Sequence, residues 1–363
     1  MTDIIKQRED KIKNNKEPKK TIKELRCSTG STLLDLALGG AKDQFGLPYG
    51  RFINIVGDTS TGKTLTSLEI IANAVYEDKN VKHNYDAAES GNTFNTKKMW
   101  NFDLNETYRS RTVQGAYRNI NKFCKELKDD EKGIYILDSL DGLCSAEDIF
   151  RAQKKLKEKS NNNEYENKES DEKEKGSYHL DKQKFLSNTF FPSLTPLILK
   201  KNVMVIIISQ VRDNIGVMFG AKHTRSGGKA LEFFCSVIYW LAVTEKAIAE
   251  ERFLGATVKV NITKNRVERS NRKVLFTYST QFGVDDITTS LDFLYDFRTP
   301  LGKLKGSKTK PNMITYEGVE YAREDFILFV EENNLEGWLK EQVINKWEEI
   351  EESVLVDRKQ KYI

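Results

Sequence analysis

Apolar and polar positions alternate along the middle of the chain in a way that predicts strands and helices in turn. RFINIV (51–56), GIYILD (133–138) and VMVIIIS (203–209) are short apolar runs typical of buried strands. After the first run, apolar residues recur at helical spacing, namely Leu65, Leu68, Ala72 and Val75. This alternation predicts an α/β fold with a mostly parallel central sheet. Three β-rich runs follow, CSVIYWLAVT, ATVKVNIT and KVLFTYST.

The pattern changes at three places, which divide the chain. Residues 1–26 are rich in Lys, Asn and Glu with few apolar positions, so we expect a basic, polar segment, with an oligomerisation helix as one use for it. Residues 151–176 have almost no apolar side chains and predict a mobile loop inserted into a domain that spans 27–300. A Lys- and Gly-rich linker then opens residues 301–363, where we expect a small helical C-terminal domain.

Charge and cysteine usage exclude several classes of protein. The 58 basic and 54 acidic residues leave a net charge of only +4, so a polyanion must be met by a local patch. Three scattered histidines and four cysteines without a CxxC pair argue against a His-rich metal centre and a zinc ribbon. With no apolar run of membrane-span length and no signal-like amino end, we expect a soluble, cytoplasmic protein without a membrane partner.

The segment GDTSTGKT (57–64) follows the first predicted strand and fits the phosphate-loop pattern G-x-x-x-x-G-K-[ST]. Two glycines let the backbone curl so that its N–H groups face one centre, Lys63 reaches the β- and γ-phosphates, and Thr64 offers a hydroxyl to Mg²⁺. We therefore expect ATP and Mg²⁺ as cofactors. The nucleotide-binding residues would be Gly57, Asp58, Thr59, Ser60, Thr61, Gly62, Lys63, Thr64 and Leu65.

Polar residues at the ends of the other predicted strands supply the remaining parts of an ATPase site. Asp138 ends GIYILD directly and is the expected second Mg²⁺ ligand, with Asp141 as its competitor. Glu89 is the candidate catalytic carboxylate, with Asp86 as the rival. Gln210 ends the third apolar strand, from which it could hydrogen-bond the γ-phosphate.

A loop rich in glycine follows that strand and predicts contact with nucleic acid. Apolar side chains on a glycine-hinged loop, ringed by cations, suit insertion between bases while the cations meet phosphates. The alternative, that Val217–Phe219 enter a core, fits poorly with so many glycines. The expected DNA-binding residues here are Arg212, Asn214, Ile215, Gly216, Val217, Met218, Phe219, Arg225, Gly227 and Gly228.

The order of these parts resembles the RecA family of recombinases across residues 27–300. STGSTLLDLALGG and GLPYGRFINIVG leading into GDTSTGKT resemble the family's entry to its phosphate loop, and ILDSLDGL resembles its Mg²⁺-binding strand. SQVRDNIGVMFG followed by SGGKALEFFCSV is similar to the second DNA-binding loop of bacterial RecA. The diverged remainder and the Lys- and Asn-rich composition are most like a phage-type RecA-like recombinase.

The resemblance implies roles for particular residues. Gln210 would be the γ-phosphate sensor that links the nucleotide to the DNA loop, and Glu89 the catalytic carboxylate. Lys264 and Arg266 resemble the family's pair of cations that reach the ATP of a neighbouring subunit. Residues i and i+2 of a strand point the same way, and these two continue the apolar face of ATVKVNIT beyond the core. The alternative explanation for these two cations is that they lie on a strand end exposed to solvent.

The chain also departs from the family pattern. Arg266 stands where the family usually has Lys, and Glu232 stands where bacterial RecA has Lys. Residues 147–177 replace the first DNA-binding loop, so only a loose role carries over to its expected phosphate or base contacts, Tyr178, Lys182 and Lys184.

The function implied is that of a DNA-dependent ATPase that hydrolyses ATP to ADP and phosphate in a bacterial cell or phage-infected host. It would form helical filaments on single-stranded DNA, with ATP between subunits, and promote pairing and strand exchange with homologous double-stranded DNA. The alternatives are a RecA-fold motor or repair ATPase of the ring-helicase type, a P-loop kinase, and a filament that only coats DNA.

Overall fold

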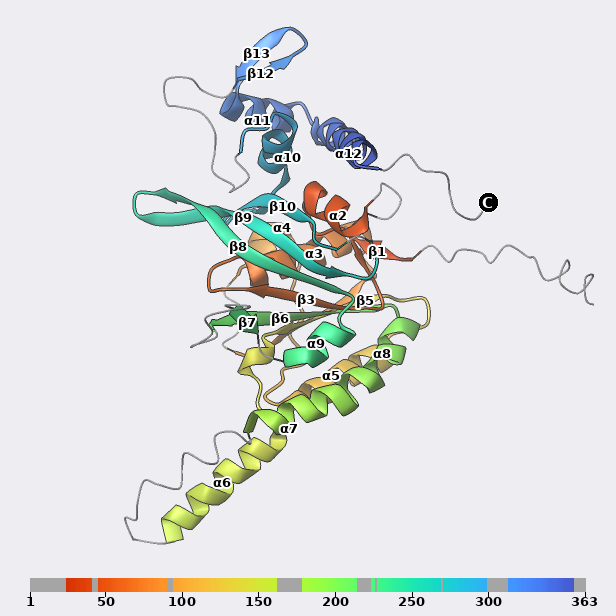
Figure 1. Ribbon diagram of the computed structural model, residues 1–363, viewed down its shortest axis with the longest axis vertical. Helices are drawn as coiled ribbons and strands as arrows, with labels where there is room; N and C mark the ends of the chain where they lie inside the picture. The colour runs from red at the N-terminus through yellow and green to blue at the C-terminus, as the bar shows by residue number, and fades with distance from the viewer. Residues whose placement is uncertain are drawn as a thin grey trace, which may run out of the picture.

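A large sheet forms the centre of the molecule, and most of its strands are parallel (Figure 1). The computed structural model describes residues 24–40, 45–89, 94–161, 178–213, 223–225, 227–268, 270–298 and 313–355. The strand order is β11-β10-β9-β8-β3-β6-β5-β4. The parallel strands are β3 (Phe52–Gly57), β4 (Lys82–Ala87), β5 (Gly133–Asp138), β6 (Val203–Asp213) and β8 (Val237–Ala249). The α/β fold expected from the sequence is confirmed.

Antiparallel strands extend one side of the sheet. They are β9 (Arg252–Asn265), β10 (Lys273–Ser279) and β11 (Gly283–Asp285), and β8 to β10 correspond to the three predicted β-rich runs. The short β7 (His223–Arg225) pairs with the end of β6, and β1 (Arg26–Cys27) pairs with β2 (Leu47–Pro48).

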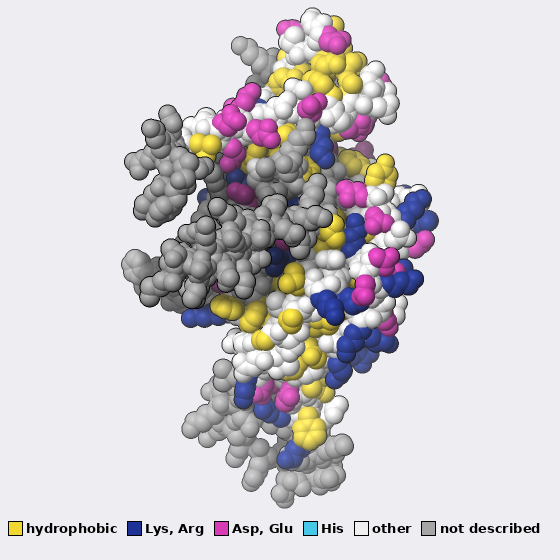
Figure 2. Space-filling view, turned by 90° about the vertical axis from the view of Figure 1, so that its right-hand side faces the viewer, with side chains coloured by type: hydrophobic (Ala, Val, Ile, Leu, Met, Phe, Trp, Pro, Cys, Tyr) yellow, Lys and Arg dark blue, Asp and Glu magenta, His cyan; other side chains and the backbone are white. Residues whose placement is uncertain are grey.

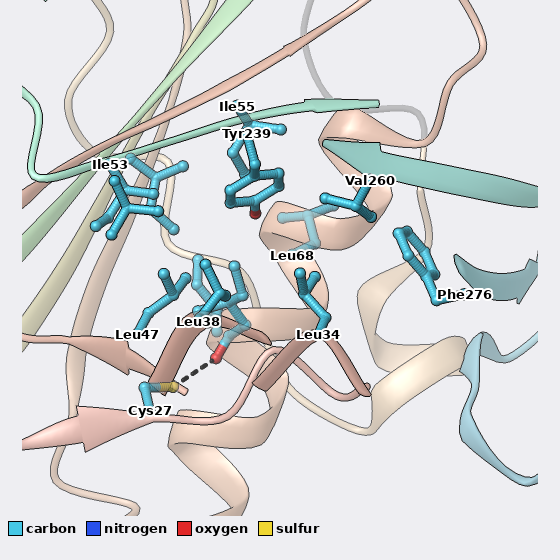
Figure 3. Packing of buried hydrophobic residues seen from close by; sticks show 14 of the residues in the cluster. Cys27, Leu34, Leu38, Leu47, Ile53, Ile55, Leu68, Tyr239, Val260 and Phe276 are labelled. Atoms are coloured by element: carbon cyan, nitrogen blue, oxygen red, sulfur yellow. Dashed lines mark hydrogen bonds between the residues drawn. The ribbon is translucent and has the colours of Figure 1, made fainter. Parts of the chain in front are cut away.

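Side chains of the central strand β3 point alternately to the two faces of the sheet and contribute to a hydrophobic core on each face. Ile53 and Ile55 face one side, where they pack with α2 (Thr32–Gly39) and α3 (Lys63–Glu77), as Figure 3 shows. Phe52 faces the other side. The helices there are α5 (Val113–Glu126), α8 (Phe191–Lys200) and α9 (Gly228–Phe234). Because both faces are covered, β3, β5 and the first part of β6 carry long apolar runs, whereas the edge strand β4 (KHNYDA) is more polar.

The inserted segment begins as a helix rather than as the loop expected from residue 151. The helix α6 spans Ala146–Asn161 and projects from the lower end of the molecule in Figure 1. The helix α7 (Tyr178–Phe185) leads back through a π-helical turn, η3 (Leu186–Phe190), into α8. Residues 162–176 of the expected loop lie outside the described residues.

The C-terminal region is less purely helical and less separate than expected. It contains the strand pair β12 (Met313–Tyr316) and β13 (Val319–Ala322), followed by α11 (Arg323–Glu332) and α12 (Glu336–Ser353). Residues of α10 (Asp286–Leu294), α11 and the strands form a third core, whereas Val343, Ile344 and Trp347 of α12 join the core beside α2. The C-terminal region is therefore anchored on the central domain.

Surface charge is unevenly distributed on the face shown in Figure 2. Lys and Arg side chains gather over its middle and lower part, whereas Asp and Glu are more frequent toward the top, where α11 and α12 lie. The small net charge therefore hides local patches of opposite sign.

Two short helices complete the described part of the fold, α4 (Thr96–Trp100) and the 3-10 turn η2 (Leu140–Gly142).

Candidate functional site

The predicted phosphate loop lies between β3 and α3, at the carboxyl edge of the parallel strands. Gly57 ends β3, and Gly62 caps α3 with a left-handed φ of 85°. A Cβ at Gly57 would lie 2.4 Å from Thr61 Oγ1, and one at Gly62 would lie 2.9 Å from the Tyr278 ring. Both positions therefore require glycine. The resulting turn at a helix amino end is the geometry that binds phosphate.

The ammonium group of Lys63 lies among carboxylates. Its Nζ donates to the carbonyl of Asp58 over 2.6 Å. Burial lowers the pKa of Lys63, while the nearby negative charges of Asp138, Asp58, Glu89 and Asp141 act to raise it. A nucleotide polyphosphate entering among four carboxylates needs a cation besides Lys63, because like charges at close range repel.

The two expected magnesium ligands meet at the end of β5. Thr64 Oγ1 donates to Asp138 Oδ2 over 2.6 Å, and the Tyr85 hydroxyl donates to the same oxygen over 2.8 Å. Hydroxyl and carboxylate oxygens are the ligands that Mg²⁺ takes, usually with retained water molecules. Thr64 and Asp138 therefore fit the metal that the phosphate loop implies, and Tyr85 orients the carboxylate.

The candidate catalytic carboxylate contacts the candidate phosphate sensor directly. Glu89 Oε1 accepts hydrogen bonds from Gln210 Nε2, at 2.9 Å, and from the Ser139 hydroxyl. Asp141 Oδ2 in turn accepts from the backbone N–H of Gln210 over 2.9 Å. The ends of β4, β5 and β6 thus bring Glu89, Gln210 and the turn after Asp138 together.

Asp86, the rival to Glu89, lies elsewhere. Its side chain is 0% exposed, with Oδ1 accepting from the Ser110 N–H and Oδ2 accepting from the Tyr135 and Ser110 hydroxyls, over 2.5–2.7 Å. Burial raises the pKa of Asp86, and these hydrogen bonds oppose the shift. Asp86 ties β4 to the segment before α5, and this structural role leaves Glu89, which is exposed, as the candidate for catalysis.

The glycine-rich loop leaves the sheet next to Gln210. Beyond that residue β6 continues and pairs with β7, in a register that joins Val211 to Arg225 and Asp213 to His223. The expected DNA contacts at 214–219 and the side chain of Arg212 lie outside the described residues. The two strands form a neck that ties both ends of the loop to the candidate sensor, Gln210.

Residues at the far end of the loop and in the insertion are placed in different environments. Gly227 caps α9 with a φ of 82°, and a Cβ there would lie 2.6 Å from Leu231. Arg225 is half-buried, with its guanidinium 5.8 Å from the centre of the Trp240 ring. Lys184 is exposed on α7, as a DNA contact requires. Lys182 is buried and bound to backbone carbonyls, so its expected phosphate or base contact is wrong.

Lys264 lies near the end of β9 and Arg266 just beyond it, toward the end of the sheet away from the phosphate loop. Arg266 N donates to the carbonyl of Ser236, at the start of β8, whereas Gly57 is level with Leu241. Five residue steps along a strand separate these levels by roughly 17 Å. Arg266 therefore lies far from the phosphate loop of its own chain, and Lys264, which pairs with Ile238, lies three steps, or roughly 10 Å along the strand, from the level of Gly57.

Two residues of the site, Tyr85 and Tyr278, belong to no sequence motif. Tyr85 lies within β4, four residues before Glu89, and its inward position follows from strand alternation. Tyr278 donates from its hydroxyl to the carbonyl of Ser60 over 3.1 Å, although more than 200 residues separate them. Only the antiparallel extension of the sheet brings β10 to the phosphate loop, so Tyr278 could not be found by local spacing.

Comparison with known families agrees with this geometry. The RecA N-terminal domain matches residues 8–120 and 166–285, which is more than half of the chain. Much of the insertion, including α6, falls in the gap between the two matched ranges. Within the described residues no helix is long and apolar enough to cross a membrane. The extent of the match shows that this chain belongs to the RecA family, and the phosphate loop, Asp138 and Gln210 on one edge of the sheet agree with it.

Proposed function

We propose that this chain is an ATP-dependent DNA recombinase that assembles on single-stranded DNA and promotes pairing and strand exchange with a homologous duplex. The observation that carries the proposal is the 2.9 Å hydrogen bond between Glu89 and Gln210. It joins the candidate hydrolytic carboxylate to Gln210, the residue directly before the neck from which the glycine-rich loop emerges. Binding of DNA to that loop can therefore change the position of the Glu89 carboxylate.

The residues of the site have distinct parts in hydrolysis. ATP with Mg²⁺ supplies the phosphoryl group and the cation that neutralises its charge, held by Lys63, Thr64 and Asp138. Glu89 positions the attacking water and accepts its proton, for which an exposed carboxylate near the phosphate edge is suited. Gln210 exchanges its bond to Glu89 for one to the γ-phosphate, which changes the position of the loop neck.

The separation of Lys264 and Arg266 from their own phosphate loop supports a site shared between subunits. Lys264 Nζ donates to the carbonyls of Glu232 and Phe233, and the Arg266 guanidinium lies 5.8 Å from the centre of the Phe233 ring. Phe233 is 65% exposed. An exposed aromatic ring beside two cations is the composition of an interface anchor. In a filament this surface would meet the next subunit's nucleotide, where arginine can act as a finger.

The alternative functions differ in what they require. A motor or repair ATPase of the ring-helicase type would share the phosphate site, but it has no need for the IGVMFG loop that follows the neck. A DNA-coating filament would share everything except strand exchange.

Three measurements on the same preparation of the protein test the proposal. ATP hydrolysis is measured with and without single-stranded DNA, filaments are sought by negative-stain microscopy with a slowly hydrolysed ATP analogue, and exchange is followed between a circular single strand and a linear homologous duplex. The proposal predicts DNA-stimulated hydrolysis, helical filaments and joint molecules. Closed rings, or filaments without joint molecules, would favour one of the alternatives.

A further inference from the structure

The two helices of the insertion are joined to each other near the body of the protein. Arg151 of α6 and Asp181 of α7 form an ion pair with Nη2 2.7 Å from Oδ2, and Arg151 also lies near Asp148. Both helices leave the core on the same side in Figure 1. A force on either helix is therefore passed to the base of α7, where Asp181 adjoins Lys182.

Lys182 connects α7 to the turn that follows the Mg²⁺-type strand. Its side chain is only 9% exposed, and its Nζ donates to the carbonyls of Leu140 and Leu143, each over 2.7 Å. Burial of an ammonium group is costly, and an apolar residue would fill the space without that cost. The lysine fixes two backbone carbonyls of the turn to one point on α7, which an apolar side chain cannot do.

That turn touches the chemical centre at several points. Ser139 and Gly142 contact Glu89, the first through its hydroxyl and the second through a close approach that would place a Cβ 2.8 Å from Glu89 Cγ. Asp141 accepts from the N–H of Gln210. A displacement of residues 139–143 therefore changes the positions of the carboxylate and the sensor together.

The far end of the glycine-rich loop converges on the same place. A Cβ at Gly227 would lie 2.9 Å from Leu140, and one at Gly228 would lie 3.5 Å from the amide of Gln183 on α7. The turn thus contacts the insertion on one side and the root of the glycine-rich loop on the other.

We propose that Lys182 is a positioning residue through which the insertion controls nucleotide hydrolysis. Single-stranded DNA that engages α6 and α7 shifts α7, and Lys182 carries the shift to the turn and hence to Glu89. This proposal rests on the proposed function for its DNA ligand, but the mechanical connection between α7 and the nucleotide site does not. It adds a second input to the site, separate from the loop at 214–222.

The connection is tested first without DNA, by hydrogen exchange of the full-length protein. Coupling between two sites is reciprocal, so a slowly hydrolysed ATP analogue should slow amide exchange in α7 of the wild type at least threefold. The Lys182→Met variant should lose that protection while its phosphate loop is still protected. The matched control is Lys125→Met, which replaces an exposed lysine of α5 and should behave as wild type. If the analogue leaves α7 exchange unchanged in the wild type, the connection is refuted without any variant.

Hydrolysis supplies the second reading. In Lys182→Met the DNA-stimulated kcat should fall at least tenfold. Its KM for ATP and its hydrolysis rate without DNA should stay within about twofold of wild type. Lys182→Arg should recover part of the stimulation by DNA. Equal loss of the basal and stimulated rates, or full stimulation in folded Lys182→Met, would overturn the proposal. A wild type that DNA does not stimulate would instead contradict the proposed function, while α7 protection by the nucleotide would still stand.

Discussion

Replacing Asp86 separates the structural carboxylate from the catalytic one. In Asp86→Ala three buried donors lose their acceptor, namely the N–H and hydroxyl of Ser110 and the hydroxyl of Tyr135. Each buried donor left unsatisfied costs about 1–3 kcal/mol, and because the three share one carboxylate the sum is not additive, so we expect a total of about 3–5 kcal/mol. At ~2–4 °C per kcal/mol for a domain of this size, the melting temperature should fall by about 6–20 °C.

The comparison variant is Glu89→Gln, which alters an exposed side chain and keeps an oxygen that can accept from Ser139. Its melting temperature should stay within about 2 °C of wild type, while ATP turnover in the presence of DNA should fall by about 10²–10⁴-fold. Melting curves are recorded by circular dichroism, and turnover is measured well below the lower melting temperature. The reasoning fails if Asp86→Ala melts like wild type and loses turnover, because Asp86 would then be the catalytic group.

Three other substitutions test the site and the fold. Lys63→Ala should keep its melting temperature but lose ATP binding in a titration with a fluorescent analogue, because the phosphates lose their nearest cation; normal DNA-stimulated turnover in the folded variant would refute the site. Burial raises the pKa of Glu69 to about 7, so the folded state binds the extra proton and wild-type stability falls as the pH rises from 4.5 to 7. Glu69→Gln removes this dependence and should gain up to about 3 kcal/mol relative to wild type between pH 4.5 and 8 in denaturant titrations; parallel pH profiles would contradict it. Phe219→Ala should weaken binding to single-stranded DNA by about 1–3 kcal/mol in anisotropy titrations with little change in nucleotide affinity; unchanged DNA binding with earlier melting would place Phe219 in a core.

The chemistry at the sheet edge could be predicted because its residues follow directly after apolar runs. The phosphate loop and Asp138 are fixed by a strand end and a short motif, and the parallel arrangement then brings Glu89 and Gln210 to the same edge. The choice between Glu89 and Asp86 needed the structure, because both lie near the carboxyl end of the same strand and the hydrogen bonds of Asp86 to Ser110 and Tyr135 distinguish them.

The parts that were mispredicted depend on contacts between distant segments or on propensity that composition obscured. The segment RAQKKLKEK has few apolar residues, yet all its residues favour helix, and this preference accounts for α6. The β12–β13 pair turns at Glu317 and Gly318, both with positive φ, a two-residue hairpin signal that alternation in MITY and VEYA supports. From the sequence alone Lys182 is expected to be a surface cation, whereas in the fold its Nζ lies 2.7 Å from two backbone carbonyls some 40 residues away.

The central claim, that each ATP site is completed by the next subunit, is tested most directly by mixing two inactive variants. Lys264→Ala keeps an intact phosphate loop, and Lys63→Ala keeps both cations, Lys264 and Arg266. Each alone should lose most DNA-stimulated hydrolysis, since groups of the arginine-finger type supply about 10³–10⁵ in rate. Mixed on single-stranded DNA, they should regain part of the activity, because a junction of the right polarity holds one complete site. No recovery at any mixing ratio, with co-assembly confirmed by a labelled subunit, would contradict a shared site.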